Sequence, residues 1–422
     1  LKRKRDPSGA RSDAADGLCL GKFARRLRTS LARTAAATPL APPRGHTPVS
    51  FPVPARSSAA ASSSSAPAPV TPVAPMHSYL AHATNLADVD AARELRYTTT
   101  SPLPPDATCR GLRNLGNTCY GNALVFSLSK IPSVRRWLHE HLHAAVKPPL
   151  HPPRCPLCML ARDVEQLAVT GARPAHEPEV MRHRATWNPL FGGVAQQDVH
   201  EAFQTLCARC DDVDAAALRA LPRCHTMRQA AFEASADRWS TPCNQIFGNL
   251  QRIHVTCSAC NTTSEGLYER AHGHALSLAT ADSNTVEVLM TENLAPDPLD
   301  AAYRCNACNA TGQGIKRTEI VHWPPVLVLS FKRFEFDRRT LNSNKITRHI
   351  AYAMQYKPRP DVTYTLRSVI VHLGLFGAGH YVAYVRARND QWYFCDDDMV
   401  PRRVVNPLDV LRQQAYMLIY ER

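Results

Sequence analysis

Residues 111–128 read Gly-Leu-Arg-Asn-Leu-Gly-Asn-Thr-Cys-Tyr-Gly-Asn-Ala-Leu-Val-Phe-Ser-Leu, a turn-rich stretch that runs into one cysteine and then into an apolar segment. Asn117 or Thr118 is the expected N-cap of a helix. Cys119 would then lie in the first turn, where free backbone N–H groups and the positive end of the helix dipole favour the nucleophilic thiolate. The simpler interpretation is a small buried side chain at a helix start. The helix itself is predicted from four apolar residues at helical spacing, Tyr120, Leu124, Val125 and Leu128.

Chain length, cysteine content and net charge restrict the class of protein. A chain of 422 residues is long enough for more than one domain. Its 14 cysteines include C-x-x-C pairs, which indicate metal binding in a reducing compartment rather than a disulfide scaffold. No apolar run approaches about 18 residues and no signal-peptide pattern is visible, so we expect no membrane contact. Of the formal net charge of +14, residues 1–105 carry +8, from 14 Lys/Arg and 6 Asp/Glu, which does not favour a nucleic-acid partner for the whole chain.

Residues 1–105 are predicted to be a disordered, basic tail rich in Ser, Ala and Pro. The cluster Lys2–Arg5 is a candidate nuclear import signal, so we expect the nucleus or the cytoplasm as location. Residues 17–87 contain no acidic residue, which is typical of an organellar transit peptide. The charged and polar segment upstream of them argues against that interpretation.

Order is expected from Asp106 onward, with helices first and strands later. The expected helices are Val134–His143, Leu157–Val169, Asp198–Cys210 and Ala215–Leu221. The expected strands are Ile253–Thr256, Ala275–Leu278, Val326–Phe331, Val369–Leu373, Tyr381–Val385, Gln391–Cys395 and Tyr416–Tyr420. This order predicts an α+β fold in which a helical part packs against an antiparallel sheet.

Two matching C-x-x-C pairs predict a structural metal site. Each pair precedes a polar turn, and the first pair follows a short strand. Two such knuckles are typical of a zinc ribbon, in which four thiolates close a tetrahedral Zn site that is architectural rather than catalytic. The predicted ligands are Cys257, Cys260, Cys305 and Cys308.

Two further C-x-x-C pairs give a weaker signal. Cys155 and Cys158 open a helix with His151 nearby, whereas Cys207 and Cys210 lie within a predicted helix. The two pairs could form a second zinc site together. We favour the simpler interpretation, in which all four are buried small side chains at i,i+3 spacing.

A thiolate nucleophile needs a general base and a group that orients it. His380 is predicted at the start of one strand, and Asp396 follows the end of the next strand, so the two can be neighbours in an antiparallel sheet. His372 competes with His380 for the role of base, and residue types alone do not choose between them. The order cysteine, histidine, polar orienter is that of papain-like proteases.

Four motifs together resemble the catalytic domain of the ubiquitin-specific protease family. Gly111–Asn122 resembles its cysteine box, and Gln196–Glu201 resembles a Gln-Asp segment that opens a helix of the thumb. Leu327–Phe334 resembles the strand that leads into the palm. The fourth motif is a histidine box, Gly379–Tyr384 followed by Trp392–Asp397. The resemblance covers essentially all of the ordered region.

The resemblance implies a papain-like, hand-shaped fold in residues 106–422, with a helical thumb (about 106–245), zinc-tipped fingers (about 246–325) and a β-sheet palm (about 326–422). It implies Cys119 as nucleophile, His380 as base and Asp396 as its orienting acid, which settles the choice against His372. Asn114 would be an oxyanion-hole donor, and Asp397 would assist it. Gly374–Gly379 would be a mobile loop that gates the cleft.

The activity implied is hydrolysis of the isopeptide bond between the C-terminal glycine of ubiquitin and a lysine, through a thioester. Residues that depart from the family pattern are Gly121 for Met, Phe126 for Gln, Ala202 for Phe and Cys395 for Phe, none of them catalytic. A catalytically silent ubiquitin-binding scaffold is the alternative, although it would not need all three catalytic residues. A zinc-ribbon nucleic-acid binder is disfavoured because basic and aromatic residues are scarce around the knuckles.

Overall fold

The computed structural model describes residues 110–143, 154–169, 173–220, 241–264, 266–278, 284–337, 342–375 and 377–422. Contacts along the chain divide it into two units, residues 1–75 and 76–422, and all described residues belong to the second unit. The predicted tail of residues 1–105, with its cluster Lys2–Arg5, lies outside the described residues, and so does His151.

Helices predominate up to Phe247. They are α3 (Cys119–Leu128), α4 (Pro132–His143), α5 (Pro156–Leu167), α6 (Glu179–Arg182), the short 3-10 helices η1 (Arg184–Thr186) and η2 (Pro189–Gly192), α7 (Val199–Ala220) and α9 (Pro242–Phe247). Two later helices are α10 (Val286–Asn293) and α11 (Leu408–Leu411).

The predicted interruption of α7 after Cys210 is wrong, because the helix runs on without a break. Asp211 at this point accepts hydrogen bonds from the Thr241 hydroxyl and from Asn244 Nδ2 (2.9 Å). These contacts from the start of α9 stabilise a residue whose side chain would otherwise favour a turn.

The strands form three sheets. Those of the first sheet, in spatial order β2-β1-β5-β4, are β2 (Leu267–His272), β1 (Gly248–Cys257), β5 (Gly314–His322) and β4 (Asp297–Pro298). The central sheet has eight strands in the order β13-β12-β11-β10-β14-β6-β3, with β9 paired to β10. These are β13 (Arg402–Val404), β12 (Trp392–Cys395), β11 (Ala378–Arg386), β10 (Val362–Leu375), β14 (Ala415–Glu421), β6 (Val326–Lys332), β3 (His274–Ser277) and β9 (Gln355–Arg359). The third sheet is the antiparallel pair of β7 (Phe334–Asp337) and β8 (Asn342–Lys345).

The central sheet is buried on both faces, and its apolar side chains alternate between two cores. In β6, Val328 belongs to the core that includes α3, α4, α5 and α7, whereas Leu327 and Leu329 belong to the opposite core with α10. In β14, Met417 and Leu418 alternate in the same way. This arrangement explains why both strands read as continuous apolar runs.

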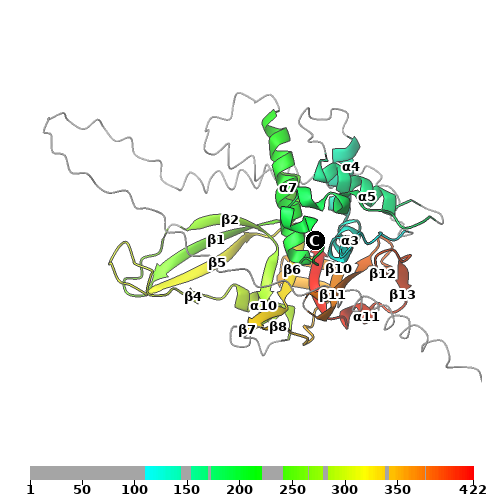
Figure 1. Cartoon of the computed structure of the whole chain (residues 1–422). Coiled ribbons are helices and arrows are strands. Elements are labelled where there is room, and N and C mark those ends of the chain that lie inside the picture. The colour runs from blue at the N-terminus through cyan, green and yellow to red at the C-terminus, as the bar shows by residue number, and fades with distance from the viewer. Residues whose placement is uncertain are drawn as a thin grey trace, which may run out of the picture. The chain divides into compact units, whose positions relative to one another are not determined.

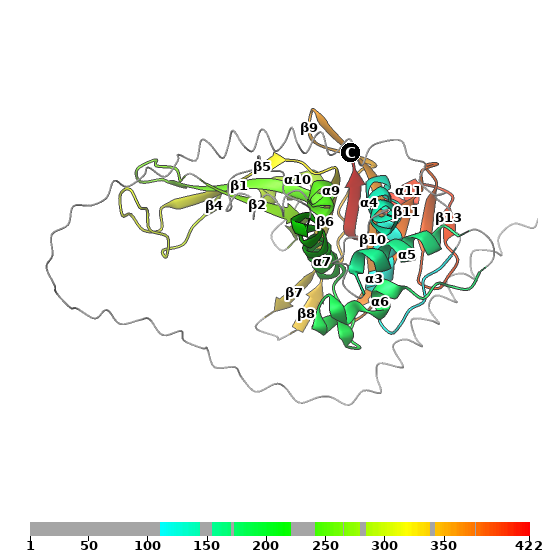
Figure 2. The ribbon, with the colours of Figure 1, turned by 90° about the horizontal axis from the view of Figure 1, so that it is seen from above.

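All pairings in the central sheet are antiparallel except that of β3 with β6. Figure 1 shows α3 and α5 beside strands β10 to β13, and the sheet of β1, β2 and β5 extending away from them. Figure 2 shows α3, α4 and α5 gathered over one face of β10 and β11. The prediction of an α+β fold, with helices first and an antiparallel sheet later, is confirmed. No helix within the described ranges is both long and apolar enough to cross a membrane.

Candidate active site and metal-binding cluster

Cys119 is the first residue of α3. Thr118 occupies the N-cap position, but its hydroxyl does not cap the helix and instead accepts a hydrogen bond from Leu115 N (2.9 Å). Every residue of α3 is buried, so the helix packs on all sides rather than along the single predicted face. Cys119 therefore lies at the N-terminus of a buried helix, next to the positive end of the helix dipole and the free backbone N–H groups.

His380 and Asp396 meet where β11 and β12 run side by side. His380 Nε2 lies 2.7 Å from Asp396 Oδ1. Burial alone would lower the pKa of His380, but its hydrogen bonds to Asp396 and Cys119 outweigh burial and raise that pKa to about 10. Asp396 occupies Nε2, so Nδ1 is the nitrogen left for the cysteine. Cys119, His380 and Asp396 thus form a hydrogen-bonded series.

His372 lies on β10 opposite Tyr381 and takes no part in this series. Burial, with the nearby charges of Lys345 and His380, lowers the pKa of His372 to about 3. A histidine that stays neutral and lies away from Asp396 is not placed to act as the base. The structure therefore favours His380 over His372.

Gln196 joins the three segments of the site, a contact that sequence reasoning missed. Its Nε2 donates to Cys119 Sγ (3.2 Å) and to Gly379 O (2.9 Å), while its Oε1 lies 3.5 Å from His372 Nε2. One signal could have indicated this position. Gln196 comes two residues before Asp198, whose carboxylate accepts from His200 N (2.6 Å) and caps the N-terminus of α7. The cap fixes the backbone where α7 begins, close to Gln196.

Asn114 lies beside the site, and hydrogen bonds fix its orientation. Its Oδ1 accepts from the backbone N–H of Gly116 (3.0 Å) and Thr118 (3.1 Å), and its Nδ2 donates to Asp397 Oδ2 (2.8 Å). The Asn122 amide donates to the other oxygen of Asp397 (2.9 Å). The Asp397 carboxylate thus accepts hydrogen bonds from Asn114 and Asn122 while one of its oxygens lies within 4.8 Å of a His380 ring nitrogen. One N–H of the Asn114 amide is not committed to Asp397.

Asp397 joins the histidine segment to the cysteine segment. Its backbone O accepts from Leu112 N (2.7 Å), and its φ of 41° is in the left-handed region. Burial raises the pKa of its carboxyl, against the opposing effects of His380 and of the Asn122 and Asn114 amides. Gly111 is also needed here, because a Cβ at this position would lie 2.5 Å from the backbone of Asp398.

Glycines lie at the facing ends of β10 and β11. Gly374 pairs with Gly379, and Leu375 with Ala378, so strand pairing continues to the end of the hairpin. Gly374 and Gly377 have φ of 87° and 70°, which favours glycine. The expected loop is therefore a β-hairpin in the described residues.

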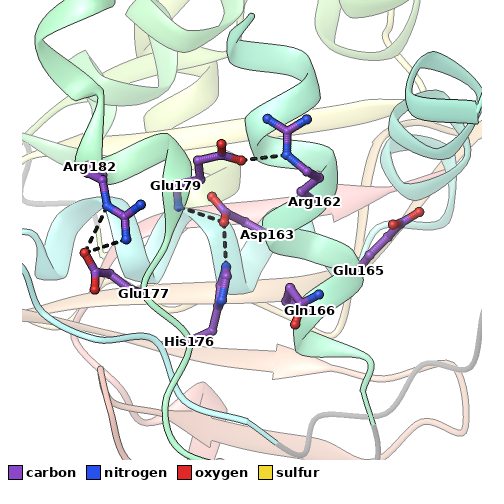
Figure 3. A pocket seen from close by; sticks show the side chains of 8 residues that line it. All are labelled: Arg162, Asp163, Glu165, Gln166, His176, Glu177, Glu179 and Arg182. Atoms are coloured by element: carbon purple, nitrogen blue, oxygen red, sulfur yellow. Dashed lines mark hydrogen bonds and ion pairs between the residues drawn. The ribbon is translucent and has the colours of Figure 1, made fainter. Parts of the chain in front are cut away.

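A pocket of about 380 Å³ lies away from the cysteine and histidine, between α5, α6 and the segment before α6 (Figure 3). Ion pairs join its side chains, and the buried Asp163 accepts from His176 Nε2 (2.7 Å), Glu179 N and Val180 N. The backbone of His176 pairs with Gly111 and Arg113. The contacts of Asp163 and His176 therefore stabilise the segment that leads to Cys119. Its lining residues are Arg162, Asp163, Glu165, Gln166, His176, Glu177, Glu179 and Arg182.

Met181 fills the space that Gly121 leaves in α3. A Cβ added to Gly121 would lie 2.1 Å from Met181 Sδ, and Met181 is fully buried. A methionine from α6 thus stands next to the position where the resembled family usually has one. Cys395 is buried too, and burial raises the pKa of its thiol to about 12, so it is a neutral packing residue.

The four predicted ligand cysteines come together at the end of the first sheet, with their sulfurs within 4.8 Å of one another. Cys257 Sγ lies 3.8 Å from Cys308 Sγ, and Cys260 Sγ lies 3.7 Å from Cys305 Sγ. A tetrahedral metal with ~2.3 Å bonds to sulfur holds its ligands about 3.8 Å apart, so the spacing fits. The cluster is positioned to bind a metal.

Both metal-binding knuckles have the same backbone. Asn261 N donates to Cys257 O (2.8 Å), and Asn309 N donates to Cys305 O (2.9 Å). Both asparagines have left-handed φ, 56° and 59°. Asparagine is a residue that tolerates this conformation, which explains why each C-x-x-C is followed by one.

The other two cysteine pairs do not share a site in the described residues. Cys155 and Cys158 group with His141. Cys207 lies near Cys243, whose Sγ is 3.7 Å from Cys207 O. Cys207 and Cys210 are both buried within α7.

A model of the family "Ubiquitin carboxyl-terminal hydrolase" matches residues 110–420. Ubiquitin carboxyl-terminal hydrolase 17-like protein C of Mus musculus is 28% identical over 323 residues, which cover 74% of this chain and 54% of that protein. Ubiquitin carboxyl-terminal hydrolase 42 of Homo sapiens is 30% identical over 327 residues, 74% of this chain and 23% of that protein. The chain thus spans about half or less of the length of these curated relatives.

Two solved structures share the fold. The SAGA DUB module of Ubp8, Sgf11, Sus1 and Sgf73 bound to monoubiquitin matches with a TM-score of 0.61 at 21% identity, over 82% of this chain and 75% of that chain. The same module bound to ubiquitin aldehyde gives the same values. These neighbours support the papain-like fold, and the family model covers the helices, both larger sheets and the cysteine–histidine site. The chain belongs to the ubiquitin carboxyl-terminal hydrolase family.

Proposed function

We propose that this chain is a thiol-dependent deubiquitinase that hydrolyses the bond between the C-terminal glycine of ubiquitin and a lysine side chain. The observation that carries the proposal is the hydrogen-bonded series Cys119, His380 and Asp396, built from α3, β11 and the end of β12. A solved relative described as bound to monoubiquitin supports ubiquitin as partner.

In the first half of the reaction, the Cys119 thiolate attacks the glycine carbonyl carbon and forms a C–S bond. His380 gives its proton to the leaving lysine amine as the C–N bond breaks. Asp396 holds the imidazole by its Nε2, so that the other nitrogen faces the sulfur. In the second half, His380 takes a proton from water, which attacks the thioester and releases the ubiquitin carboxylate.

Asn114 would donate the N–H not committed to Asp397 to the oxyanion of each tetrahedral intermediate. Three hydrogen bonds to its Oδ1 and one from its Nδ2 fix the amide before substrate arrives. A donor held in place in advance needs no reorganisation during the reaction, which is the property an oxyanion hole requires.

The ubiquitin tail would approach Cys119 beside Gln196. Two exposed apolar side chains flank the segments that Gln196 joins: Val194 is 86% exposed and Leu375 is 71% exposed. Asn117 Nδ2 holds the backbone of Val194 at 2.6 Å. Such exposed apolar residues next to a nucleophile are suited to contact the apolar part of an extended peptide.

We propose zinc as the metal of the four-cysteine cluster. Four thiolates in tetrahedral spacing are the ligand set that zinc prefers, and a site with four protein ligands has no open position for chemistry. The cluster would stabilise the end of the sheet of β1, β2 and β5.

The test uses ubiquitin that carries an alkyne electrophile at its C-terminus. The full chain should form a covalent adduct that mass spectrometry locates on Cys119, and Cys119→Ala should form none. Absence of an adduct with the wild-type chain, together with measurable binding of free ubiquitin, would support the silent scaffold instead. Labelling of Cys119→Ala at the wild-type rate would show that the nucleophile is another residue.

A further inference from the structure

A second cluster of metal-ligand residues lies between α4 and α5, outside the site described above. His141, Cys155 and Cys158 bring their ligand atoms within 4.8 Å of one another. We propose that these three residues bind a second zinc ion. The structure thereby changes the ligand set considered from the sequence, because it joins the Cys155 pair to His141 rather than to Cys207 and Cys210.

The spacing of the atoms fits a tetrahedral zinc. His141 Nε2 lies 3.6 Å from Cys155 Sγ. Bonds of ~2.3 Å to sulfur and ~2.0–2.1 Å to nitrogen at the tetrahedral angle place these two atoms about 3.6 Å apart. Cys158 contacts Cys155 through its side chain and its backbone N–H. The cluster thus has the same scale as the four-cysteine cluster, where sulfurs are 3.7 and 3.8 Å apart.

The local backbone prepares the two sulfurs for a metal. Cys155 is the N-cap of α5, Pro156 follows at the first helical position, and Cys158 lies in the first turn. Cys155 and Cys158 are both buried, at 3% and 8% exposure. The start of α5 thus places the two sulfurs next to each other in a buried position.

The types of ligand atom distinguish this cluster from another group of aspartate, cysteine and histidine residues. A comparison within the same structure shows the difference. In the group Asp211, Cys243 and His272, the imidazole Nε2 lies 2.9 Å from Asn244 Oδ1, and Asp211 accepts from Thr241 and Asn244. That group satisfies its polar atoms without a metal, so we assign none to it. The group of His141, Cys155 and Cys158 instead offers two sulfurs and one imidazole nitrogen, the donor types that zinc prefers, at the spacing of zinc ligands.

The role assigned to this zinc is structural. It would fix the end of α4 (Pro132–His143) to the start of α5 (Pro156–Leu167), two helices that pack together. α5 carries Asp163, which holds His176 beside the segment before Cys119. The described residues supply three ligands, which leaves a fourth position of this zinc for water, so we expect it to leave to a chelator before the zinc of the four-cysteine cluster does.

The first measurement is the zinc content of the full chain, purified without added chelator, which needs no ubiquitin. We expect about two zinc ions per chain in the wild type and about one in His141→Ala and in the double variant Cys155→Ser/Cys158→Ser. His139→Ala is the matched control, because His139 lies on the same helix and its Nδ1 faces Glu165 Oε1 at 3.4 Å, away from the sulfurs. This control should keep about two zinc ions.

A second measurement keeps the test informative if a variant folds poorly. His141→Cys should restore the second zinc, with an X-ray absorption spectrum that has gained sulfur at the expense of nitrogen. One zinc per chain in the wild type, removed only by changes at Cys257 or Cys308, would overturn the proposal. A disulfide between Cys155 and Cys158 in the purified wild type, seen by mass spectrometry, would overturn it as well. Two zinc ions retained in His141→Ala would refute the ligand set.

Discussion

Gln196→Glu replaces one nitrogen by oxygen at the centre of the site and changes the sign of its electrostatic effect. In the wild type, an amide N–H donates to the sulfur at 3.2 Å and to Gly379 O at 2.9 Å. In the variant, an ionised carboxylate at the same distance would repel both the thiolate and the carbonyl. Two charges 3.2 Å apart repel each other by about 5 kcal/mol at an effective dielectric constant of ~20.

Gln196 is half-buried, so water screens part of this repulsion. We therefore expect a loss of about 2–3 kcal/mol, which corresponds to a kcat/KM about 30–150-fold below wild type at neutral pH. Once protonated, the carboxyl group that Gln196→Glu introduces can donate a hydrogen bond as the amide does, so activity should recover as the pH falls. Gln196→Ala removes the donor without adding charge, so it should lose about 1 kcal/mol and keep the wild-type pH profile.

The assay is hydrolysis of a fluorogenic amide at the ubiquitin C-terminus across the pH range, with alkylation of Cys119 by iodoacetamide as a readout that needs no ubiquitin. Gln197→Glu is the matched control, because in the described part of the chain the Gln197 amide donates to the backbone oxygens of Leu190 and Ala195. The reasoning is refuted if Gln196→Glu and Gln196→Ala have the same pH profile, or if Gln197→Glu shifts it equally.

Three further predictions follow from other contacts. Asn114→Ala should lower kcat about 100–1,000-fold with little change in ubiquitin affinity. Because Asp397 acts through Asn114, adding Asp397→Ala to Asn114→Ala should lower kcat little further. Equal losses in kcat and in affinity would contradict the oxyanion role of Asn114. The pKa of His380, raised to about 10 from its ordinary value near 6.5, means that its charged form stabilises the fold fully below about pH 6.5, and that this stability is lost as pH rises through about 10. Asp396→Asn should therefore be less stable than wild type in urea at neutral pH, with the difference shrinking toward pH 10; parallel curves would contradict this. Met181→Ala should cost about 2–5 kcal/mol of stability, and Gly121→Met should restore part of it, whereas additive losses in thermal unfolding would show that the two positions do not share one space.

The fold was largely predictable because its local patterns agree with its packing. Each expected strand overlaps a strand in the structure, since runs rich in β-branched and aromatic residues were sufficient to mark them, with ends that differ by one residue at β3 and β12. β5 was missed because charged side chains, at half-buried Lys316 and exposed Arg317 and Glu319, interrupt the apolar pattern by which a strand is recognised. The continuous α7 was missed because the contacts from Thr241 and Asn244 to Asp211 come from 30 and 33 residues away.

The residues of the site also fall into those that the sequence predicted and those that it missed. Cys119, His380 and Asp396 were found because a helix start and two adjacent strands already bring such residues together, and the family motifs chose between the histidines. Gln196, His141 and the contact of Asp397 with Asn114 depend on separations of 77, 14 and 283 residues in the chain. Periodicity carries no information about such pairings, because it describes only the face of an element on which a residue lies.

The short turn after β12 connects the two halves of the chemistry. Asp396 faces His380, and the next residue, with φ of 41°, turns its carboxylate to Asn114 and Asn122. Adjacent residues thus hydrogen-bond the proposed base and the proposed oxyanion donor, although both carboxylates keep an oxygen within 4.8 Å of a His380 ring nitrogen. A backbone change at this turn should therefore impair both functions together, whereas a side-chain change at either position impairs one.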